Sequence, residues 1–541
     1  MPELTTGQAI TKALIANGID TLFGIPGAHM YDFIDAVAQH ADDIAFYVTR
    51  HEQGAAYMAF GYAKSTGKVG AYTVVPGPGV LNSGAALCTA YGATTPLLCI
   101  TGNIMSHLIG KGRGQLHELP DQLATLRSFI KWAERINTPD AAPAIVNEAF
   151  RQLLSGRQQP VAIEAPWDVF GLSGEVELLP AASPDLPPEF DPQDLQAAVA
   201  LIEAAQNPLI MVGAGAVAAG TEILALAQAL QAPVTSHRSG KGIVSDHSDY
   251  SISPVAANRM WSEVDLVIGI GSRLELPHLR WRWQPEGMKT IRIDIDSAEM
   301  QRLVPDVGLV CDAVVGTAAL LQAINISPRP DRTDEFRRLQ DDADKALQAV
   351  QPQYDYLQAI RSELPDDGYF VEEICQAGFT ARMCFKVYEP RHYITCGYQE
   401  TLGFGFNTAL GVKVAHPNKA VVSICGDGGF MFGVQELATA VKYGINLVTV
   451  VFNNNSYGNV RRDQHTRYDG RLLGSELTNP DFVSLAESFG ALGLRADNPA
   501  QLQSALRQGF AAARPVIIEV PVPTGSEQSP WPLLHPQPPN A

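Results

Sequence analysis

The chain has 541 residues, of which 46% are hydrophobic and 18% charged, so it is long enough for several buried cores and too apolar to be a disordered protein. Its formal net charge of -18, without a basic cluster, argues against nucleic acid and anionic membrane surfaces as main partners. The seven cysteines include no C-x-x-C pair, which argues against a structural zinc site and a disulfide framework and favours a cytoplasmic protein. Gly or Pro interrupts every long apolar stretch, so we expect no transmembrane helix.

The first element expected along the chain is a short amphipathic helix near the N-terminus. The segment MPELTTGQAITKALIANGI places an acid before the first base and offers a threonine as helix cap. Ala9, Ile10, Ala13 and Leu14 would share one face, and Gly18 would end the helix. This pattern differs from a secretory signal, so we expect none.

Short Val/Ile/Leu runs then alternate with helical periodicity along the whole chain. VGAYTVV precedes LNSGAALCTAYGA in the first third, PLIMVGAG precedes TEILALAQAL in the second, and AVVSIC precedes VQELATAVKYG in the last. Such alternation is typical of parallel sheets that are covered by helices on both faces. We therefore predict an α/β protein with three doubly wound parallel-sheet domains.

Two connectors divide these domains. Residues 176–194 are rich in proline and acidic residues, and residues 326–355 are charged with a partly helical pattern. The domains are therefore expected at residues 1–178, 190–328 and 355–541.

The stretch ICGDGGFMFGVQELATAVKYGINLVTVVFNNNSYG (424–458) has the pattern of a strand, a helix and a second strand. A right-handed crossover brings such strands side by side with their carboxyl ends at one edge, so Asp427 and Asn454 should lie close together. Carboxylate and amide oxygens suit Mg²⁺, although an ordinary strand-helix-strand unit with a polar rim is the structural alternative. Three glycines would let a phosphate approach the backbone: Gly426, Gly428 and Gly429.

GDG, 24 intervening residues and NN match the signature of thiamine diphosphate (ThDP) enzymes in residue types and interval. Together with the segments at 23–33, 47–63 and 74–102, the motif makes the whole chain resemble the acetolactate synthase, 2-oxo acid decarboxylase and benzaldehyde lyase group. The resemblance implies an N-terminal pyrimidine-binding domain, a middle domain and a C-terminal diphosphate-binding domain. It places Mg²⁺ on three ligands: the side chains of Asp427 and Asn454 and the main-chain carbonyl of Ser456.

The same resemblance implies further contacts with the coenzyme. Glu52 ends a strand and begins a helix of small residues, and it would protonate the pyrimidine N1′ so that the coenzyme's own amino group can remove the thiazolium C2 proton. Leu402 would support the bent form of ThDP, and main-chain atoms near Glu400 would meet the pyrimidine amino group. The other expected coenzyme contacts are Pro78, Asn82, Gln376, Ala377, Gly426, Gly428, Gly429, Asn454 and Tyr457.

The middle domain carries two Gly-containing strand ends. VGAGAVAAG (212–220) and VIGIGSRLEL (267–276) could form a dinucleotide site, but a single Gly-rich turn is a weak signal and a scaffold role is the alternative. Acetolactate synthases carry FAD here, usually beside an R-F-D-D-R-like segment. Residues 272–276 read SRLEL instead, which puts FAD in doubt.

Substrate-side residues decide which ThDP reaction occurs. His29 lies in a GAH segment similar to that of benzaldehyde lyase, and FIKWAERI (129–136) is also similar to that enzyme. His29 and His117 are candidates for proton transfer to substrate oxygens, with Gln115 as a hydrogen-bond partner. Lone loop histidines are as often structural, and this alternative stays open.

The sequence departs from two related enzyme types at positions that bear on which reaction it catalyses. The adjacent histidines of pyruvate decarboxylases are absent from the sequence, and Gln-Leu-His-Glu at 115–118 stands where acetolactate synthases carry A-F-Q-E. The second departure puts acetolactate formation in doubt. Asn455 and Asn459 are further candidates to line the pocket.

The expected function is that of a ThDP- and Mg²⁺-dependent carboligase or lyase, which acts on 2-oxo acids, aldehydes and 2-hydroxy ketones through an ylide and an enamine. A simple decarboxylase of a 2-oxo acid or acyl-CoA is one alternative, and a non-catalytic ThDP-binding regulatory subunit is another. In this family the pyrimidine-binding domain of one subunit faces the diphosphate-binding domain of another, which implies a homodimer at minimum and commonly a homotetramer. The tail at 526–536 either covers the site entrance with Trp531 and Leu533 or packs on a neighbouring subunit.

Overall fold

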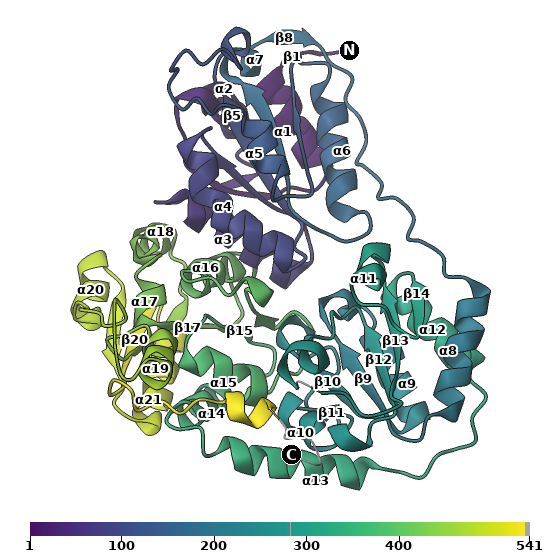
Figure 1. The fold of residues 1–541 in the computed structure, drawn as a ribbon. Helices are drawn as coiled ribbons and strands as arrows, with labels where there is room; N and C mark the ends of the chain where they lie inside the picture. The colour runs from purple at the N-terminus through teal and green to yellow at the C-terminus, as the bar shows by residue number, and fades with distance from the viewer. Residues whose placement is uncertain (282, 536–541) are drawn as a thin grey trace.

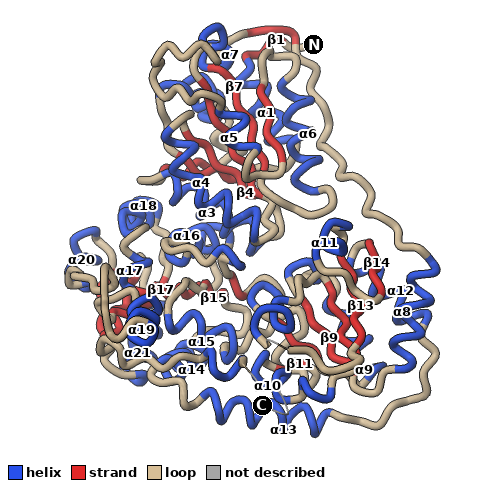
Figure 2. Tube along the Cα trace, in the orientation of Figure 1, coloured by secondary structure: helices blue, strands red, loops and turns tan. Residues whose placement is uncertain are grey.

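The computed structural model describes residues 1–281 and 283–535, and within them three parallel sheets of six strands each are covered by helices (Figures 1 and 2). We call the parts that hold these sheets the N-terminal, middle and C-terminal domains. The predicted α/β class and its three doubly wound parallel sheets are confirmed. A short antiparallel pair, β1 (Glu3–Thr5) with β8 (Ser173–Glu175), joins the two ends of the N-terminal domain.

In the N-terminal domain the strand order is β3-β2-β4-β5-β7-β6, and it reverses between β2 and β4. The predicted first helix is confirmed: Thr5 caps it by accepting a hydrogen bond from the Gln8 amide, and the four residues expected on one face are buried. The strands are β2 (Thr21–Gly24), β3 (Ala45–Val48), β4 (Gly70–Val74), β5 (Leu97–Asn103), β6 (Trp132–Arg135) and β7 (Val161–Pro166). The helices are α1 (Thr6–Ala16), α2 (Tyr31–Ala38), α3 (Glu52–Thr66), α4 (Pro78–Gly92), α5 (Gln122–Arg127), α6 (Ala142–Leu154) and α7 (Trp167–Phe170).

The middle domain has the strand order β11-β10-β9-β12-β13-β14, which reverses between β9 and β12. This is the order of dinucleotide-binding folds, whose ligands lie at the point of reversal. Its strands are β9 (Pro208–Val212), β10 (Val234–Ser236), β11 (Ser251–Ile252), β12 (Leu266–Ile270), β13 (Lys289–Asp294) and β14 (Val307–Val310). Its helices are α8 (Pro192–Ala204), α9 (Gly220–Leu230), α10 (Pro254–Arg259), α11 (Ser297–Arg302) and α12 (Ala313–Ala323).

The two connectors differ in structure. The first leaves β8 and runs without helix or strand to α8, across the gap between two domains in Figure 1. The second contains the long helix α13 (Thr333–Leu347), and α14 (Gln353–Glu363) follows it, so the expected partial helicity is confirmed.

In the C-terminal domain the strand order is β16-β15-β17-β18-β20-β19, with the reversal between β15 and β17. The predicted strand-helix-strand unit is present, because β17 and β18 pair in parallel, although the helix between them is shorter than its pattern indicated and begins with one 3₁₀ turn. The strands are β15 (Tyr369–Val371), β16 (Tyr393–Ile394), β17 (Val421–Gly426), β18 (Val448–Asn453), β19 (Leu492–Arg495) and β20 (Val516–Pro521). The helices are α15 (Gln376–Cys384), α16 (Gly405–Ala415), α17 (Asp427–Phe430), α18 (Leu437–Tyr443), α19 (Gly458–Arg467), α20 (Phe482–Phe489) and α21 (Pro499–Ala511).

The N-terminal and C-terminal domains share one apolar core where α3 packs against α16. Phe404 contacts Tyr57 and Phe60 edge to face, with ring centroids 5.5 and 5.3 Å apart. The two helices cross so closely that a Cβ on Gly61 would lie 2.0 Å from the carbonyl oxygen of Thr408, so only glycine fits at this position. This contact fixes the start of α3 relative to the chain that leads into α16.

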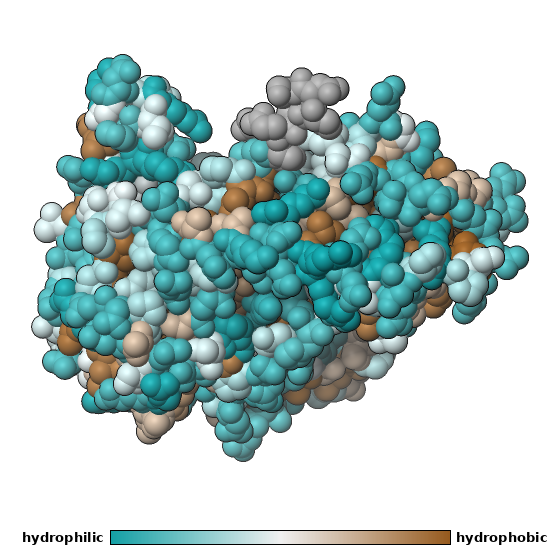
Figure 3. Space-filling model, turned by 90° about the horizontal axis from the view of Figure 1, so that it is seen from below, coloured by the Kyte–Doolittle hydropathy of each residue, from teal (hydrophilic) through white to brown (hydrophobic). Residues whose placement is uncertain are grey.

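The surface seen from below is mostly hydrophilic, with apolar side chains scattered between polar ones (Figure 3). Among the described residues, no helix is both long and apolar enough to cross a membrane.

Candidate functional site

The polar loops that follow β17 and β18 lie side by side. Asp427 comes directly after β17, and the register pairs Gly426 with Phe452, two residues before Asn454. The Nδ2 atom of Asn479 donates to the Asp427 carboxylate at 2.7 Å and to the Asn453 oxygen at 3.0 Å, so it joins the two loops. Burial raises the pKa of Asp427, and hydrogen bonds from the amide of Gly428 and from Asn479 oppose this rise. No sequence pattern indicated Asn479, which lies 52 residues after Asp427.

Asn454 is held from both sides. Its Oδ1 accepts hydrogen bonds from the amide and the hydroxyl of Ser456, both at 3.0 Å. Its Nδ2 donates to the carboxylate of Glu527 at 2.5 Å, and the Thr524 hydroxyl donates to its main-chain carbonyl at 2.7 Å. Burial raises the pKa of Glu527 to about 7. Glu527 was not predicted, because nothing in the chain pattern connects the tail with β18.

Two helices of the C-terminal domain begin next to these loops. Gln376 and Ala377 open α15, and α19 begins directly after Tyr457. Arg462 on α19 donates to the Gln376 side chain at 3.4 Å, so both helix starts face one region. The free N–H groups at such starts are a common binding place for phosphate.

The glycines of the GDGG turn are tightly surrounded. A Cβ on Gly428 would lie 2.5 Å from the Tyr457 ring, and one on Gly429 would lie 2.5 Å from the Glu373 carboxylate. A Cβ on Gly426 would lie 3.1 Å from Cys375. Glycine is therefore required here by close packing as well as by any approach of a ligand.

Glu373 lies fully buried beneath this turn. Its carboxylate accepts hydrogen bonds from the amides of Gly403 at 2.5 Å and Phe404 at 3.2 Å, so it fixes the chain next to Leu402. Burial raises its pKa to about 7, against the opposing effect of these hydrogen bonds. The sequence interpretation missed it, although two adjacent acids at the end of a buried strand are a usable signal.

At the N-terminal sheet edge, Glu52 is the first residue of α3. Its carboxylate accepts a hydrogen bond from the Asn82 side chain at 3.0 Å, and Pro78 begins the helix α4 that carries Asn82. Glu436 of the C-terminal domain accepts hydrogen bonds from the amides of Arg50 and His51, at 3.0 and 2.9 Å, just before Glu52. These contacts fix the start of α3, and Glu436 is a further residue that the sequence did not indicate.

The structure brings His29 and His117 together. Their rings stack with centroids 5.0 Å apart, and Trp167 lies 4.9 Å from the His29 ring. The Nε2 atom of His29 lies 3.0 Å from the Leu116 carbonyl oxygen, and burial, with a smaller effect of His117, lowers the His29 pKa. Gln115 lies on the same loop but is exposed.

The C-terminal tail packs on its own chain. The Trp531 ring lies 5.2 Å from Phe379 of α15 and 4.5 Å from the Arg280 guanidinium of the middle domain. Leu534 is fully buried, and His535 contacts the Arg280 carbonyl oxygen at 2.7 Å. Both expected roles of the tail, a cover over the site entrance and packing on a neighbouring subunit, stay predictions, and residue 536 lies outside the described residues.

A cavity of about 430 Å³ lies at the point where the strand order of the middle domain reverses, and residues of the other two domains also line it. Among its lining residues are Gly213 and Gly215, which follow β9, Arg238 and Glu275 of the same domain, and Tyr398 of the C-terminal domain. The structure thus gives this domain a concave surface that its weak glycine pattern did not establish.

Comparisons with known proteins agree with this architecture. Residues 4–125 match the thiamine pyrophosphate enzyme N-terminal TPP binding domain, residues 195–324 the central domain, and residues 373–520 the C-terminal TPP binding domain. An acetolactate synthase large subunit of Haemophilus influenzae is 30% identical over 94% of this chain and 93% of its own length. A probable 2-ketoarginine decarboxylase of Pseudomonas aeruginosa is 32% identical over 96% and 94%, and a probable acetolactate synthase large subunit of Methanocaldococcus jannaschii is 33% identical over 95% and 91%. The chain therefore belongs to the thiamine pyrophosphate enzymes, in the group that includes acetolactate synthases and 2-oxo acid decarboxylases.

Proposed function

We propose that this ThDP-dependent enzyme uses Mg²⁺ to make or break the bond between the two carbonyl-derived carbons of a 2-hydroxy ketone, with 2-oxo acids as donors. The observation that carries the proposal is the pairing of the β17 and β18 ends, which places Asp427 beside Asn454. A carboxylate, an amide oxygen and the Ser456 carbonyl form a set of hard oxygen donors that fits Mg²⁺. The relatives named acetolactate synthase support the carboligase class.

Each half of the coenzyme has its own set of proposed contacts. The starts of α15 and α19 would bind the diphosphate through Gln376, Ala377 and Tyr457. Leu402 and the main chain at Glu400 would contact the centre of the molecule. When bound, ThDP supplies a carbon nucleophile and an electron sink. Glu52 would hold a proton at the pyrimidine N1′ and keep the coenzyme in its reactive form.

His29 and His117 are the proposed proton-transfer groups for substrate oxygens. The Leu116 carbonyl accepts from Nε2 of His29, which leaves Nδ1 of that ring free to accept a proton. The Nδ1 atoms of both histidines are buried without a partner among the described residues. Burial lowers the His29 pKa, which favours the neutral ring that can accept a proton.

The site is completed, in our proposal, by a second copy of the chain. Glu52 belongs to the N-terminal domain and the metal ligands belong to the C-terminal domain, and each set lies at the carboxyl edge of its own sheet. We expect a homodimer as the smallest active form and a homotetramer as the common one. Dilution below the dimer dissociation constant should abolish turnover.

A simple decarboxylase is the second candidate function. It is favoured by the relative named probable 2-ketoarginine decarboxylase, which is 32% identical over nearly the whole chain. The two candidates differ in whether the decarboxylated fragment takes a proton or attacks a second carbonyl. A non-catalytic ThDP-binding subunit is the third alternative, and it predicts coenzyme binding without turnover.

One product screen separates these functions. The full-length protein with ThDP and Mg²⁺ is given pyruvate or a longer 2-oxo acid, with and without benzaldehyde as acceptor, and separately benzoin. Hydroxy ketones formed with the acceptor, or benzaldehyde released from benzoin, support the proposal. Free aldehyde as the only product supports the decarboxylase. Glu52→Gln serves as the matched control, because it keeps the side-chain shape while removing the acid.

A further inference from the structure

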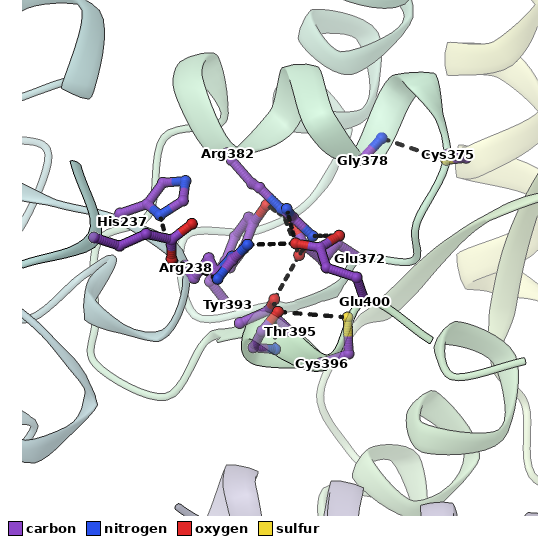
Figure 4. A network of polar contacts seen from close by, with 12 residues as sticks. His237, Arg238, Glu372, Cys375, Gly378, Arg382, Tyr393, Thr395, Cys396 and Glu400 are labelled. Carbon is purple, nitrogen blue, oxygen red and sulfur yellow. Dashed lines mark hydrogen bonds and ion pairs between the residues drawn. The ribbon is translucent and has the colours of Figure 1, made fainter. Parts of the chain in front are cut away.

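A partly buried chain of alternating charges connects the middle domain to the proposed coenzyme loop of the C-terminal domain (Figure 4). Arg382 on α15 is fully buried; its Nε donates to the Glu372 carboxylate at 2.9 Å and its Nη1 to the Glu400 carboxylate at 2.6 Å. Arg238 of the middle domain donates to the same Glu400 oxygen, and its Nη1 donates to Glu275 at 2.6 Å. Glu400 is therefore shared by two arginines from different domains.

The backbone of Glu400 has an unfavourable conformation that its ion pairs with the two arginines can stabilise. Glu400 has φ 52° and ψ 53°, the left-handed region that glycine adopts freely and a residue with a long side chain seldom does. Glu400 directly follows the 3₁₀ turn Gly397–Gln399, and the ion pairs hold its side chain from two directions. Leu402 comes two residues later, so the conformation at Glu400 sets the direction of the stretch that we propose contacts ThDP.

The charges favour an ionised Glu400. Burial alone would raise its pKa, but the positive charges of Arg382 and then Arg238 lower it overall. The same helix that carries Arg382 begins at Gln376 and Ala377, in the proposed diphosphate region. One buried arginine thus connects the loop at Glu400 with the helix at the other end of the coenzyme site.

Arg238 extends this connection into the middle domain. It lines the cavity at the strand-order reversal, together with its partner Glu275. It is 6% exposed and itself has φ 54°, so its position is closely defined by the surrounding structure. A change at this arginine would therefore reach Glu400 directly through one ion pair.

We propose that Arg238 and Arg382 are positioning residues that act through Glu400 to set the backbone at 400–402 for ThDP, so that the middle domain determines how tightly the coenzyme is held. This inference rests on the proposed function. It concerns coenzyme affinity and can be tested without any turnover.

The test measures ThDP binding to the full-length protein in saturating Mg²⁺ by isothermal titration. Glu400→Gln and Arg238→Met should each weaken binding about tenfold, which corresponds to about 1.4 kcal/mol. The double variant should lose no more than Glu400→Gln alone, because Glu400→Gln already breaks the ion pair that Arg238→Met removes. In Glu400→Gln each arginine keeps a second carboxylate, Glu372 or Glu275, and in Arg238→Met the Glu400 carboxylate keeps Arg382, so we expect these variants to fold.

One further variant tests whether the backbone conformation at Glu400 sets ThDP affinity, and a second serves as a control. Glu400→Gly should bind ThDP more tightly than Glu400→Gln, because glycine adopts a positive φ without help from an ion pair. Arg302→Met is the matched control: this middle-domain arginine also pairs with a glutamate, Glu299, but is outside the charge chain, and ThDP affinity should stay within twofold.

The outcomes are distinct. If wild-type protein does not bind ThDP, the proposed function fails. If wild-type protein binds ThDP and both Arg238→Met and Glu400→Gln bind it within twofold of wild type, this inference alone is overturned. Equal binding by Glu400→Gly and Glu400→Gln would also overturn the backbone mechanism.

A substitute variant is used if Arg238→Met does not fold, as shown by loss of its far-ultraviolet circular dichroism signal. Arg238→Lys then replaces it, because lysine keeps the charge but cannot contact two carboxylates as the guanidinium group does. Unchanged ThDP affinity of that variant would likewise overturn the inference.

Discussion

The crossing of α3 and α16 depends on glycine, and Gly411→Ala tests it most directly. A methyl group at Gly411 would lie 1.8 Å from the carbonyl oxygen of Met58 on α3. The helices would have to separate by about 1 Å, and a gap of that size already removes about a quarter to a half of the dispersion attraction in each contact. Overpacking of a core costs about 1–3 kcal/mol, of which the better helix propensity of alanine recovers less than about 1 kcal/mol. We therefore expect a net loss of about 2 kcal/mol.

Thermal unfolding of the full-length protein measures this loss. For a domain of about 150–250 residues, 2 kcal/mol corresponds to a fall in Tm of about 4–8 °C. Gly84→Ala is the matched control, since Gly84 lies within α4 and a Cβ there has no heavy atom within 4 Å. That substitution should raise stability by about 0.5–1 kcal/mol. A Gly411→Ala protein with the wild-type Tm would refute the argument that the close crossing of α3 and α16 requires glycine at this position.

Three further predictions concern single side chains of the site. Glu52→Gln should abolish turnover while ThDP remains bound, as measured by kcat and by coenzyme titration; full activity would contradict the assigned role. Asn479→Ala removes the 2.7 Å hydrogen bond to Asp427 and should weaken Mg²⁺ binding about tenfold, measured as the Mg²⁺ dependence of ThDP binding, whereas an unchanged half-saturation would show that Asn479 does not orient the ligand. Burial raises the Glu373 pKa from 4.5 to about 7, so the stability that its protonated form contributes is complete below pH 4.5 and is lost as the pH rises through 7. Glu373→Gln should therefore flatten the fall of unfolding free energy between pH 5 and pH 8, by up to about 3 kcal/mol, and an unaltered pH profile from chemical denaturation would disprove it.

The fold was predictable because its information is local. Apolar runs of strand length, helical periodicity and glycine ends repeat along the chain, and these decide both the α/β class and the parallel sheets. The capped helix α1 was predictable from a dozen residues for the same reason. The 3₁₀ turn before α18 was not, because the helical pattern around Val434 does not show that the GDGG turn delays the regular helix.

The candidate site was predictable only where one motif carries it. Asp427 and Asn454 belong to a single strand-helix-strand unit, so their proximity follows from the crossover rule. Asn479 and Glu527 reach the site from a separate loop and from the tail, and Glu436, although it lies in the same unit, contacts the start of α3 in another domain. No local pattern specifies such distant contacts. A sequence therefore shows the groups with a known chemical role before it shows those that hold them in place.

For the same reason, the sequence did not indicate that the middle domain contacts the proposed coenzyme loop. Its glycine pattern is weak, and its connection to the coenzyme loop consists of side chains that are far apart in sequence: Arg238 and Glu400 are separated by 162 positions. The contact becomes visible only when the charges are paired in three dimensions, since an isolated arginine and an isolated glutamate are both ordinary surface residues in a sequence. Here Arg238 is buried and Glu400 is partly buried at the junction of two domains, and a carboxylate in that place is stabilised by the two arginines that pair with it. A strained backbone at Glu400 and a buried pair of arginines are thus parts of one requirement, and a residue that meets only one of them should not replace Glu400 without loss of coenzyme affinity.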